Sequence, residues 1–517
     1  MKRFNTAGTC FPTEHYMVDI HERVQEIASM VERGDYFCIN RGRQYGKTTT
    51  LSALRDYLMD EYIVFSISFE GMGNKDFEEA NFYKYFLGAL NEEAELMEDI
   101  IPSEISKILR EISTVESLDE TATRTVIYKM CKLADKPVVI IIDEVDQSSN
   151  HEVFIKFLGM LRKMYLNRHR RTTFKSVILA SVFDVKNLKL KLRPDIEHEY
   201  NSPWNIAVPF DIDMSLSESG IDGMLLEYAK DHGLDFDTSA IAKLIREYTS
   251  GYPFLVSRIC QIIDTQKLSW NKEGFLTAVN VLLNEQNTLF DDLYKKLTDF
   301  PLLKEMLKDI LYHGNKKSFN YGIKEIELAS KFGYVYNNNN NAVVIANRIF
   351  ETLLYNKFIA EEESNSSMYN EGSIDKQSFI NNGMLDMKHV LERFAVHYNE
   401  IYSDKDIKFL EEMGRKLFLL YLRPIINGVG HYYVEAQTRD ETRMDIVVDY
   451  LGKRYIIEMK IWRGAVYNEA GKKQLVDYLK AMNEDTGYLI SFCFNKNKDI
   501  GVNTEKLDGK TIVEAIV

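Results

Sequence analysis

The ten residues from Asn40 to Thr49 constrain the fold of this chain more than any other stretch. They read Asn-Arg-Gly-Arg-Gln-Tyr-Gly-Lys-Thr-Thr, follow a short apolar run at 36–39 and open a run of helical spacing at 50–58. A strand, a glycine-rich loop and a helix in this order form a phosphate-binding loop, whose backbone N–H groups cradle a polyphosphate at the helix start. The alternative is a glycine-rich turn before an ordinary helix. Gly46-Lys47-Thr48, standing where the loop requires it, favours the loop.

Every position of this loop is a candidate nucleotide contact. Lys47 can reach the β and γ oxygens of a triphosphate, and the Thr48 hydroxyl can bind Mg²⁺. The general pattern has glycine where Arg41 stands, so the sequence departs from it at one position. The expected ATP-binding residues are Arg41, Gly42, Arg43, Gln44, Tyr45, Gly46, Lys47, Thr48 and Thr49.

A second strong feature is the run of β-branched residues at 138–142, which two carboxylates, Asp143 and Glu144, follow directly. Such a run is typical of a strand buried on both faces of a parallel sheet, and ligands bind at the carboxyl ends of such strands. We expect Asp143 to hold the Mg²⁺ shell and Glu144 to polarise the attacking water. The alternative is that both carboxylates only cap the next helix, expected at 152–165.

Weaker candidates surround these two features. Ser181 ends a third buried strand, at a position suited to sensing a γ-phosphate, or it forms a strand-end turn. Tyr16 lies in the segment before the loop and is a candidate base contact, with a packing role as the alternative. Five arginines near the third strand are candidates for an arginine finger, in cis or across a subunit interface of a homo-oligomer: Arg162, Arg168, Arg170, Arg171 and Arg193.

Composition indicates a globular protein with several domains. The length of 517 residues predicts about three, with 45% hydrophobic and 27% charged residues. No apolar run of ~18 residues could span a bilayer, and no apolar leader opens the chain, so we expect a cytoplasmic protein without membrane contact. The five scattered cysteines fit reduced thiols. The net charge of −14 argues against a protein coated for nonspecific nucleic-acid binding, although a local basic groove remains compatible with it.

Four segments together resemble the predicted AAA-like ATPases of bacteria, a branch of the P-loop NTPases that often carries a C-terminal nuclease-like domain: 40–50, 138–146, 176–190 and 202–206. In that group arginine at the position of Arg41 is common. The resemblance extends to a Gly-x-Pro motif, matched by residues 251–253, which implies that Pro253 lies near the adenine. The resemblance covers nearly the whole chain and is specific for ATP binding.

The expected fold class is α/β, with a P-loop parallel sheet, a helical or winged-helix module and a C-terminal α/β domain like that of restriction endonucleases. Residues 361–383 are rich in Ser, Asn, Glu and Gly, which indicates a linker. The predicted boundaries are 1–212 for the ATPase domain, 213–360 for the helical module, 361–385 for the linker and 386–517 for the last domain.

The C-terminal domain contains a predicted hairpin around Leu451-Gly452. If Tyr450 pairs with Lys453, Asp449 faces Arg454 and Asp445 falls opposite Glu458. Because side chains alternate along a strand, Glu458 and Lys460 share one face. Two carboxylates at that separation can bind one Mg²⁺, and a lysine beside them can activate water.

This cluster resembles the PD-(D/E)XK nuclease core, with Asp445 as the first acid and Glu458-Met459-Lys460 as the second acid and the lysine. Gln474 and Tyr478 match the Gln-x-x-x-Tyr element of many such nucleases. An acidic residue on the preceding helix, Glu411 or Glu412 with Glu412 favoured, is a weaker candidate for the same site, and so is Glu435. The alternative is that these charges form only the solvent face of the hairpin.

The sequence therefore predicts an ATP-hydrolysing protein whose metal-dependent nuclease domain acts on nucleic acid under ATPase control, with DNA favoured over RNA. A second hypothesis is an ATP-driven switch that binds protein or nucleic acid through a domain that does not cleave. A third hypothesis, tightly bound nucleotide without turnover, is disfavoured by the intact Lys47, Thr48, Asp143 and Glu144.

Overall fold

The computed structural model describes most of the chain. Its description leaves out residues 1, 114, 116–117, 147, 149–150, 183–202, 314–316, 339, 382, 402–410, 428–429, 435–445, 463–464, 483 and 495–499. The described residues form two compact units. Unit 1 contains Met1–Ala242, Gly251–Asp264 and Lys331–Gly333, and unit 2 contains Lys243–Ser250, Thr265–Ser330 and Tyr334–Val517.

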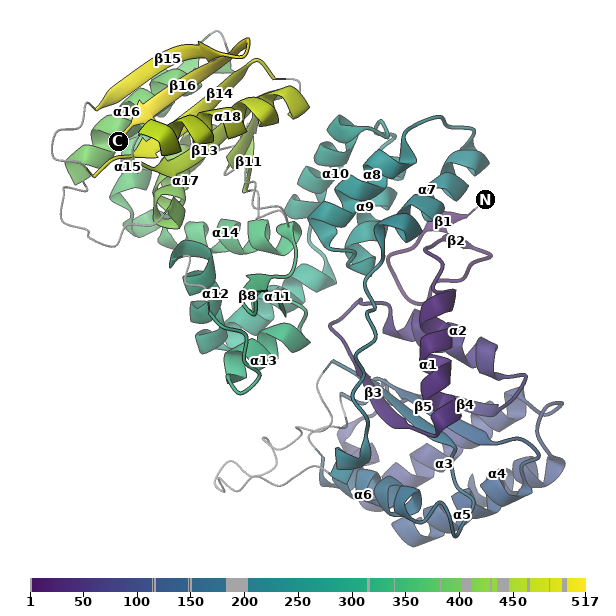
Figure 1. Cartoon of the computed structure of the whole chain (residues 1–517). Helices are drawn as coiled ribbons and strands as arrows, with labels where there is room; N and C mark the ends of the chain where they lie inside the picture. Colours follow the sequence, from purple (N-terminus) through teal and green to yellow (C-terminus); the bar gives the residue numbers. More distant parts are fainter. Residues whose placement is uncertain are drawn as a thin grey trace. The chain divides into compact units, whose positions relative to one another are not determined.

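Unit 1 is built on a four-stranded parallel sheet in the order β3-β6-β5-β4. The strands are β3 (Tyr36–Asn40), β4 (Ile63–Ser68), β5 (Val138–Asp143) and β6 (Ser176–Ser181). The helices α1 (His21–Arg33), α2 (Lys47–Leu58), α3 (Glu79–Leu96), α4 (Ser103–Ser113), α5 (Glu120–Leu133) and α6 (Glu152–Leu166) surround it (Figure 1). The order places β6 between the strand of the predicted loop and the strand that carries the carboxylates.

Both faces of this sheet are buried, as the sequence of β5 predicts. Ile140 and Ile142 pack into a core with α3 to α6, while Val139 and Ile141 pack into a second core with α1 and α2. Alternate side chains of a strand point to opposite faces, so one run of β-branched residues supplies both cores. The parallel sheet flanked by helices is confirmed.

The remaining elements of unit 1 come from both ends of its sequence. The short strands β1 (Arg3–Phe4) and β2 (His15–Tyr16) pair in parallel. The helix α7 (Glu218–His232) carries Tyr228, which contacts Phe4 and Tyr16, and the helix α9 (Pro253–Thr265) carries Gln261, whose side-chain amide donates to the Phe4 carbonyl. The N-terminal residues therefore tie α7 and α9 together.

Unit 2 begins with helices and a small hairpin. The helices are α10 (Lys272–Asn284), α11 (Thr288–Asp299), α12 (Pro301–His313), α13 (Lys324–Lys331) and α14 (Arg348–Glu362), and α8 (Thr238–Thr249) is shared by the two units. The hairpin of β7 (Val335–Asn337) and β8 (Val343–Ile345) follows α13, and a bridge from Ser318 to Ala342 extends it. Helices followed by such a hairpin are consistent with the predicted winged-helix portion.

The predicted linker at 361–385 is wrong. This segment forms α15 (Ser367–Asp375), which packs on α17 (Glu411–Ile426) so closely that a Cβ added at Gly372 would lie 2.1 Å from the Tyr421 carbonyl oxygen. Met368 is fully buried. Polar composition suggested a flexible connection, but a few apolar residues and one glycine are enough to seat a short helix on a neighbour.

Charged groups fix the same segment. The carboxylate of Asp375 accepts hydrogen bonds from Tyr421 (3.0 Å), from the Arg393 Nε (3.1 Å) and from the His397 Nε2 (2.8 Å). These partners lie on α16 (Met387–Ile401) and α17. The segment therefore belongs to the packed C-terminal part of unit 2.

Three consecutive glutamates at the end of α14 reach other helices. Glu361 pairs with Lys304 of α12 at 2.8 Å, while Glu362 and Glu363 pair with Lys416 and Arg423 of α17 at 2.5 Å each. We name these three residues the glutamate seam. It joins α12, α14 and α17 by charge in addition to apolar packing.

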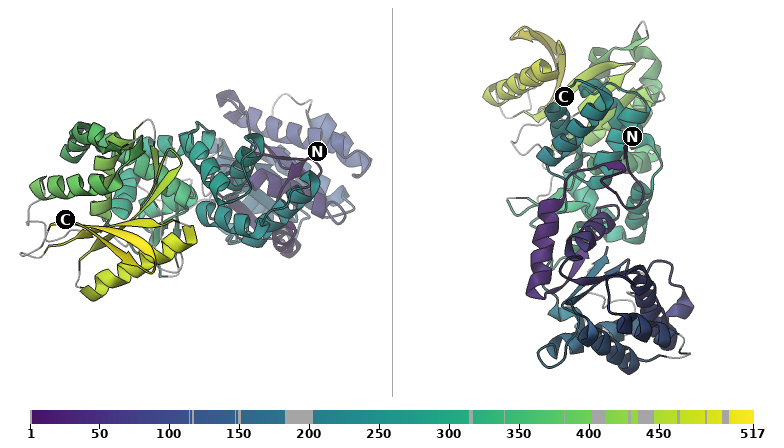
Figure 2. Two further views of the ribbon diagram at one scale, coloured as in Figure 1. Left: turned by 90° about the horizontal axis from the view of Figure 1, so that it is seen from above. Right: turned by 90° about the vertical axis from the view of Figure 1, so that its right-hand side faces the viewer.

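The C-terminal part of unit 2 holds a six-stranded mixed sheet in the order β11-β12-β13-β14-β16-β15. Its strands are β11 (Gly430–Val434), β12 (Ile446–Tyr450), β13 (Lys453–Ile461), β14 (Thr486–Phe492), β15 (Gly501–Leu507) and β16 (Lys510–Ile516). Figure 2 shows α18 (Ala465–Met482) on one side of this sheet and α16 and α17 on the other. The sequence predicted three of these strands, near their observed positions, in front of α18.

Within the described residues, no helix combines the length and the apolar character needed to cross a membrane.

Candidate active site

The stretch after β3 forms the expected loop at the start of α2. Gly46 precedes the helix with φ 76°, a left-handed conformation that glycine adopts without steric cost, and no side chain caps this helix start. Gln44 also has a positive φ of 55°. The first backbone N–H groups of a helix have no intrahelical partner, so they remain directed at whatever binds in front of α2.

Lys47 is buried against this loop. Its ammonium donates hydrogen bonds of 3.0 Å to the carbonyls of Arg41 and Gly42. Burial lowers the pKa of Lys47, while the neighbouring carboxylates Asp146, Glu144 and Asp143 act in the opposite direction. The lysine thus lies within the influence of three carboxylates that follow one another closely in the chain. Its contact with phosphate stays a prediction.

The loop and β5 meet through one hydrogen bond. The Thr48 hydroxyl donates to the Asp143 Oδ2 at 2.8 Å, although the two residues lie 95 positions apart. Hydroxyl and carboxylate oxygens are the ligands that Mg²⁺ prefers, and it binds through one or two protein groups together with substrate phosphates. The donor set therefore fits the metal that the sequence predicts here.

Glu144 lies beside Asp143 in a strained conformation. Its φ is 54°, which is uncommon for a residue with a long side chain. Burial, and then the charge of Asp143, raises the pKa of the Glu144 carboxyl. A strained, half-buried carboxyl with a raised pKa is typical of groups that move protons at active sites.

Ser181 lies close to the loop, since it pairs in register with Asn40 at the end of β3. Its hydroxyl is buried and lies 3.5 Å from the Cys38 sulfur. The backbone of the same strand end is held by Asp146, which accepts from the Val182 N–H through both oxygens. Sensing of the γ-phosphate by Ser181 stays a prediction.

Arg41 has a different place from the one expected. Its guanidinium donates to the Ile212 carbonyl at 2.8 Å and lies over the Phe210 ring. Arg41 therefore ties the segment after η4 (Pro203–Ile206) to the loop instead of reaching for phosphate with its side chain. Its carbonyl still belongs to the loop, as the Lys47 contact demonstrates.

Tyr16 lies in the core. Its side chain is 1% exposed, and its hydroxyl donates to Asp231 at 3.1 Å. Burial raises the pKa of Tyr16 to about 12. The ring contacts Phe4 and Tyr228, so the structure supports the packing alternative and gives no free ring face for a base.

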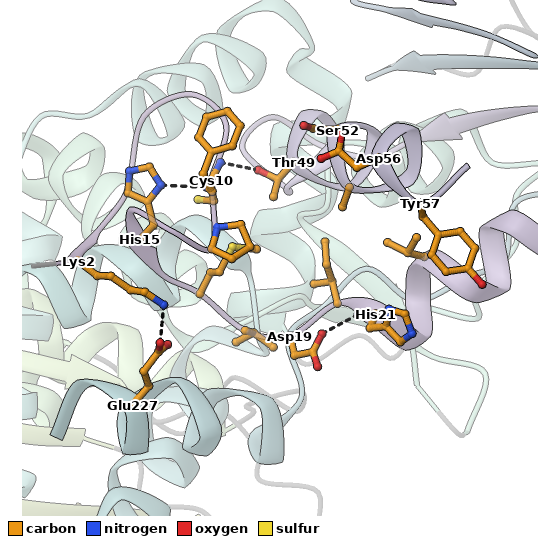
Figure 3. A pocket seen from close by; sticks show the side chains of 17 residues that line it. Lys2, Cys10, His15, Asp19, His21, Thr49, Ser52, Asp56, Tyr57 and Glu227 are labelled. Carbon is orange, nitrogen blue, oxygen red and sulfur yellow. Dashed lines mark hydrogen bonds and ion pairs between the residues drawn. The ribbon is translucent and has the colours of Figure 1, made fainter. Parts of the chain in front are cut away.

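A cavity of about 440 Å³ lies beside Tyr16 and next to α2. Thr49 and Ser52 line it from α2, the segment from Cys10 to Val24 lines another wall, and Glu227 closes it from α7 (Figure 3). The Cys10 N–H donates to the Thr49 hydroxyl, and Lys2 forms an ion pair with Glu227, as drawn in Figure 3. The cavity thus begins one residue after Thr48 on the helix that the loop opens.

The Gly-x-Pro segment contacts the loop directly. A Cβ added at Gly46 would lie 3.8 Å from the Pro253 ring, and the Tyr252 ring meets the Tyr45 ring edge-on at 4.7 Å between centroids. Pro253 therefore lies against the phosphate loop. Its contact with adenine stays a prediction.

The arginines do not single out a finger. Arg168 stacks over Tyr165 and Arg171 over Tyr128, both beside the outer helices of unit 1. Arg193 lies outside the described residues, and nothing in the geometry distinguishes Arg162 or Arg170.

The C-terminal hairpin has the predicted register. Tyr450 pairs with Lys453, Asp449 with Arg454 and Ile446 with Ile457. Leu451 and Gly452 both have positive φ, at 51° and 80°, which is the geometry of a type I′ hairpin turn. The predicted pairing and turn are confirmed.

Glu458 and Lys460 lie together on β13. The Lys460 Nζ is 2.8 Å from a Glu458 carboxylate oxygen, and the glutamate side chain is 0% exposed. Gln474 donates to the Tyr478 hydroxyl at 3.2 Å on α18, which approaches Lys460 at Gly471. The carboxylate therefore lies under α18 and does not belong to a solvent face.

Three other predicted acids receive no structural description. Asp445 and Glu435 lie outside the described residues, as does the side chain of Glu412. Among the side chains that are described, no group of three or more His, Cys, Asp or Glu is arranged to hold a metal ion. Glu458 is the one described acid of the predicted pair.

Two features of the structure were not predicted from the sequence. Phe332, in the turn after α13, brings its carbonyl so close to Gly42 that an added Cβ would lie 2.7 Å away. On β16, Glu514 is buried with Lys472 (3.0 Å) and Ser491 (2.7 Å) beneath α18. Neither carries a local motif, because each depends on residues far apart in the chain.

A family model described as AAA-like domain matches residues 13–359. The chain is similar in structure to the Walker-type ATPase of Pyrococcus abyssi, at 12% identity and a TM-score of 0.48, covering 68% of this chain and 99% of that one. It is also similar to the ORC2 protein of Aeropyrum pernix in its ADPNP–ADP complexes, at 11% identity and a TM-score of 0.38, covering 66% and 94%.

A third similar structure is the Aeropyrum pernix ORC1 protein in complex with DNA, at 11% identity and a TM-score of 0.27, covering 67% of this chain and 94% of that one. These three likenesses carry no argument about function. A search of the curated proteins finds no match. The family match spans the loop, β5 and the Gly-x-Pro segment, so the chain belongs to the AAA-like domain family and is a P-loop ATPase.

Proposed function

We propose that the protein hydrolyses ATP with Glu144 as the base, and that its C-terminal domain is a metal-dependent nuclease that acts on DNA under ATPase control. The observation that carries the first half is the bond between Thr48 and Asp143, which joins the loop to β5. Mg²⁺ bound there would neutralise charge on the β- and γ-phosphates. Lys47 would exchange its two carbonyl partners for phosphate oxygens, and Glu144 would orient water and take its proton.

The cavity beside α2 is the proposed site of the base and ribose. A ligand whose phosphates lie against Gly46 to Thr48 can place its base along the same helix, where Thr49 and Ser52 line the cavity. The volume of about 440 Å³ lies within the range of small-molecule pockets, ~300–1,000 Å³. In this placement the base meets the neighbours of Tyr16 that line the cavity, such as His15 and Met17, and not Tyr16 itself.

The nuclease half is supported by the β12–β13 register. Ile446 faces Ile457, so one more step of the antiparallel ladder would set Asp445 opposite Glu458, on the face that also carries Lys460. Two acids and a lysine fit a Mg²⁺ ion that would stabilise charge on a phosphodiester. The order of elements along the chain also supports the nuclease proposal. A helix, α17, precedes the three strands β11, β12 and β13, and a second helix, α18, connects them to β14.

The burial of Glu458 favours a second candidate. Its side chain is 0% exposed and paired with Lys460, an arrangement that also suits a structural ion pair. A domain of this kind would bind nucleic acid or protein without cleaving it, and the ATPase would act as a switch.

The test is cleavage of single- and double-stranded DNA and RNA with Mg²⁺ or Mn²⁺, with and without ATP. Wild type should cut DNA, Asp445→Ala should not, and the control Asp449→Ala on β12 should keep activity. Cleavage that persists in Asp445→Ala would place the activity elsewhere. No cleavage of any substrate by wild type would favour the switch.

The ATPase half is tested separately by turnover of ATP in wild type and Lys47→Ala. The variant should neither bind nor hydrolyse ATP, because the loop loses its one lysine. Equal turnover in both proteins would remove the loop from the reaction.

A further inference from the structure

Tyr252, the middle residue of the Gly-x-Pro segment, holds one peptide of the phosphate loop. Its hydroxyl donates a hydrogen bond to the Arg43 carbonyl, and its side chain is buried at 2% exposure. Its ring packs edge-on against Tyr45, two residues further along the loop. Thus both the backbone and a side chain of the loop rest on Tyr252.

The direction of this bond determines where the next N–H group points. The peptide joining Arg43 to Gln44 is trans and planar, so its C=O and N–H point in opposite directions. A carbonyl drawn toward Tyr252 therefore turns the Gln44 N–H away from Tyr252. Gln44 itself has φ 55°, a conformation that costs energy without glycine and needs support from its surroundings.

A phosphate-binding loop works through such N–H groups, which are aligned before the anion arrives. We propose that Tyr252 is a positioning residue for phosphate: its hydroxyl fixes the Arg43–Gln44 peptide so that the Gln44 N–H is presented to the polyphosphate. The proposal rests on the proposed ATP binding. It assigns the hydroxyl to the phosphates and not to the adenine.

The neighbouring contacts leave little freedom for other arrangements. The Phe332 carbonyl approaches Gly42 on the residue before Arg43, and the Pro253 ring approaches Gly46. Glycine is required at position 42 because a Cβ would lie 2.7 Å from that carbonyl. The loop is therefore held at both ends, and Tyr252 holds the peptide between them.

The experiment uses the full chain with Tyr252→Phe, which removes one hydroxyl and keeps the ring. Tyr83→Phe is the matched control, because the Tyr83 hydroxyl is buried in unit 1 without a hydrogen-bond partner among the described residues. The dissociation constant of ATP is measured by calorimetry, and the inhibition of ATP turnover by inorganic tripolyphosphate gives a second probe that has no base.

We expect Tyr252→Phe to weaken ATP binding about five- to tenfold, which is the effect of one lost hydrogen bond in a buried site. Inhibition by tripolyphosphate should weaken by the same factor. In Tyr252→Phe the KM for ATP should rise while kcat stays within about twofold. The control Tyr83→Phe should match wild type in all three measurements. Unchanged ATP affinity in Tyr252→Phe would overturn the proposal. Weaker ATP with unchanged tripolyphosphate would overturn it too, because the hydroxyl would then serve the base. If wild type binds no ATP, the proposed function fails instead.

Discussion

Gly372 is the position at which the packing of α15 can be tested most directly. In Gly372→Ala the new Cβ would lie 2.1 Å from the Tyr421 carbonyl oxygen and 3.0 Å from the Pro424 ring. Neither neighbour is a flexible side chain, since one is helix backbone and the other is the proline inside α17. The helix pair must therefore separate, and it loses contacts along its length.

The expected cost follows from two opposing effects. Forcing an extra group into a tight contact costs about 1–3 kcal/mol and more when backbone must move, whereas alanine in a helix gains about 1 kcal/mol over glycine. Because the clash is with backbone, we expect Gly372→Ala to lower the free energy of unfolding of unit 2 by about 2–4 kcal/mol.

The matched control is Gly88→Ala in α3, where an added Cβ meets nothing within 4 Å. This variant should be more stable than wild type by about 0.5–1 kcal/mol. Both are measured by urea denaturation followed by circular dichroism, with hydrogen exchange reporting on residues 367–375. A Gly372→Ala protein as stable as wild type, within about 0.5 kcal/mol, would mean that this segment is the linker that its composition suggests.

Three further predictions concern single side chains. Glu144→Gln should still bind ATP but lose about 10²–10⁴-fold in turnover, and unchanged turnover would contradict its role as base. Because burial raises the pKa of Glu144, the acid limb of the wild-type pH–rate profile should lie above pH 4.5. Thr48→Ala should weaken Mg²⁺–ATP about tenfold by calorimetry, while Thr50→Ala, whose buried hydroxyl has no described partner, should not. Burial would raise the pKa of Asp375, but three hydrogen bonds outweigh it and lower the pKa. Asp375→Asn should therefore be less stable at pH 7, and thermal unfolding should show the gap closing as the pH falls below 3.8, the ordinary value; a gap that stays constant with pH would contradict this.

Local sequence was a good guide wherever one strand or turn determines the structure. The β-branched run of β5 fixed a strand with two buried faces, and Leu451-Gly452 fixed both the turn and the register of its hairpin. In these places the pattern of side chains and the hydrogen-bond ladder impose the same answer.

Contacts between distant residues were not accessible in this way. Tyr252 stands beside a recognised proline, but its contact with Arg43 spans 209 positions and leaves no local trace. Tyr16 and the wall of the cavity are neighbours in sequence, and only the fold decides that the tyrosine packs on α7. For Arg41, an unusual loop residue suggested a phosphate contact, whereas its long side chain finds a carbonyl at Ile212.

The glutamate seam limits the positions at which a C-terminal fragment of this protein can begin. A shortened protein that starts at residue 386, the predicted boundary, would keep the six-stranded sheet but would strip α14 and α15 from α17. The apolar flank of α17 would be uncovered, and Lys416 and Arg423 would lose Glu362 and Glu363. Starting ahead of Arg348 retains Glu362 and Glu363 with Lys416 and Arg423 on α17, and starting ahead of α12 also retains Lys304 with Glu361. Dissection of this protein into working fragments should respect that limit.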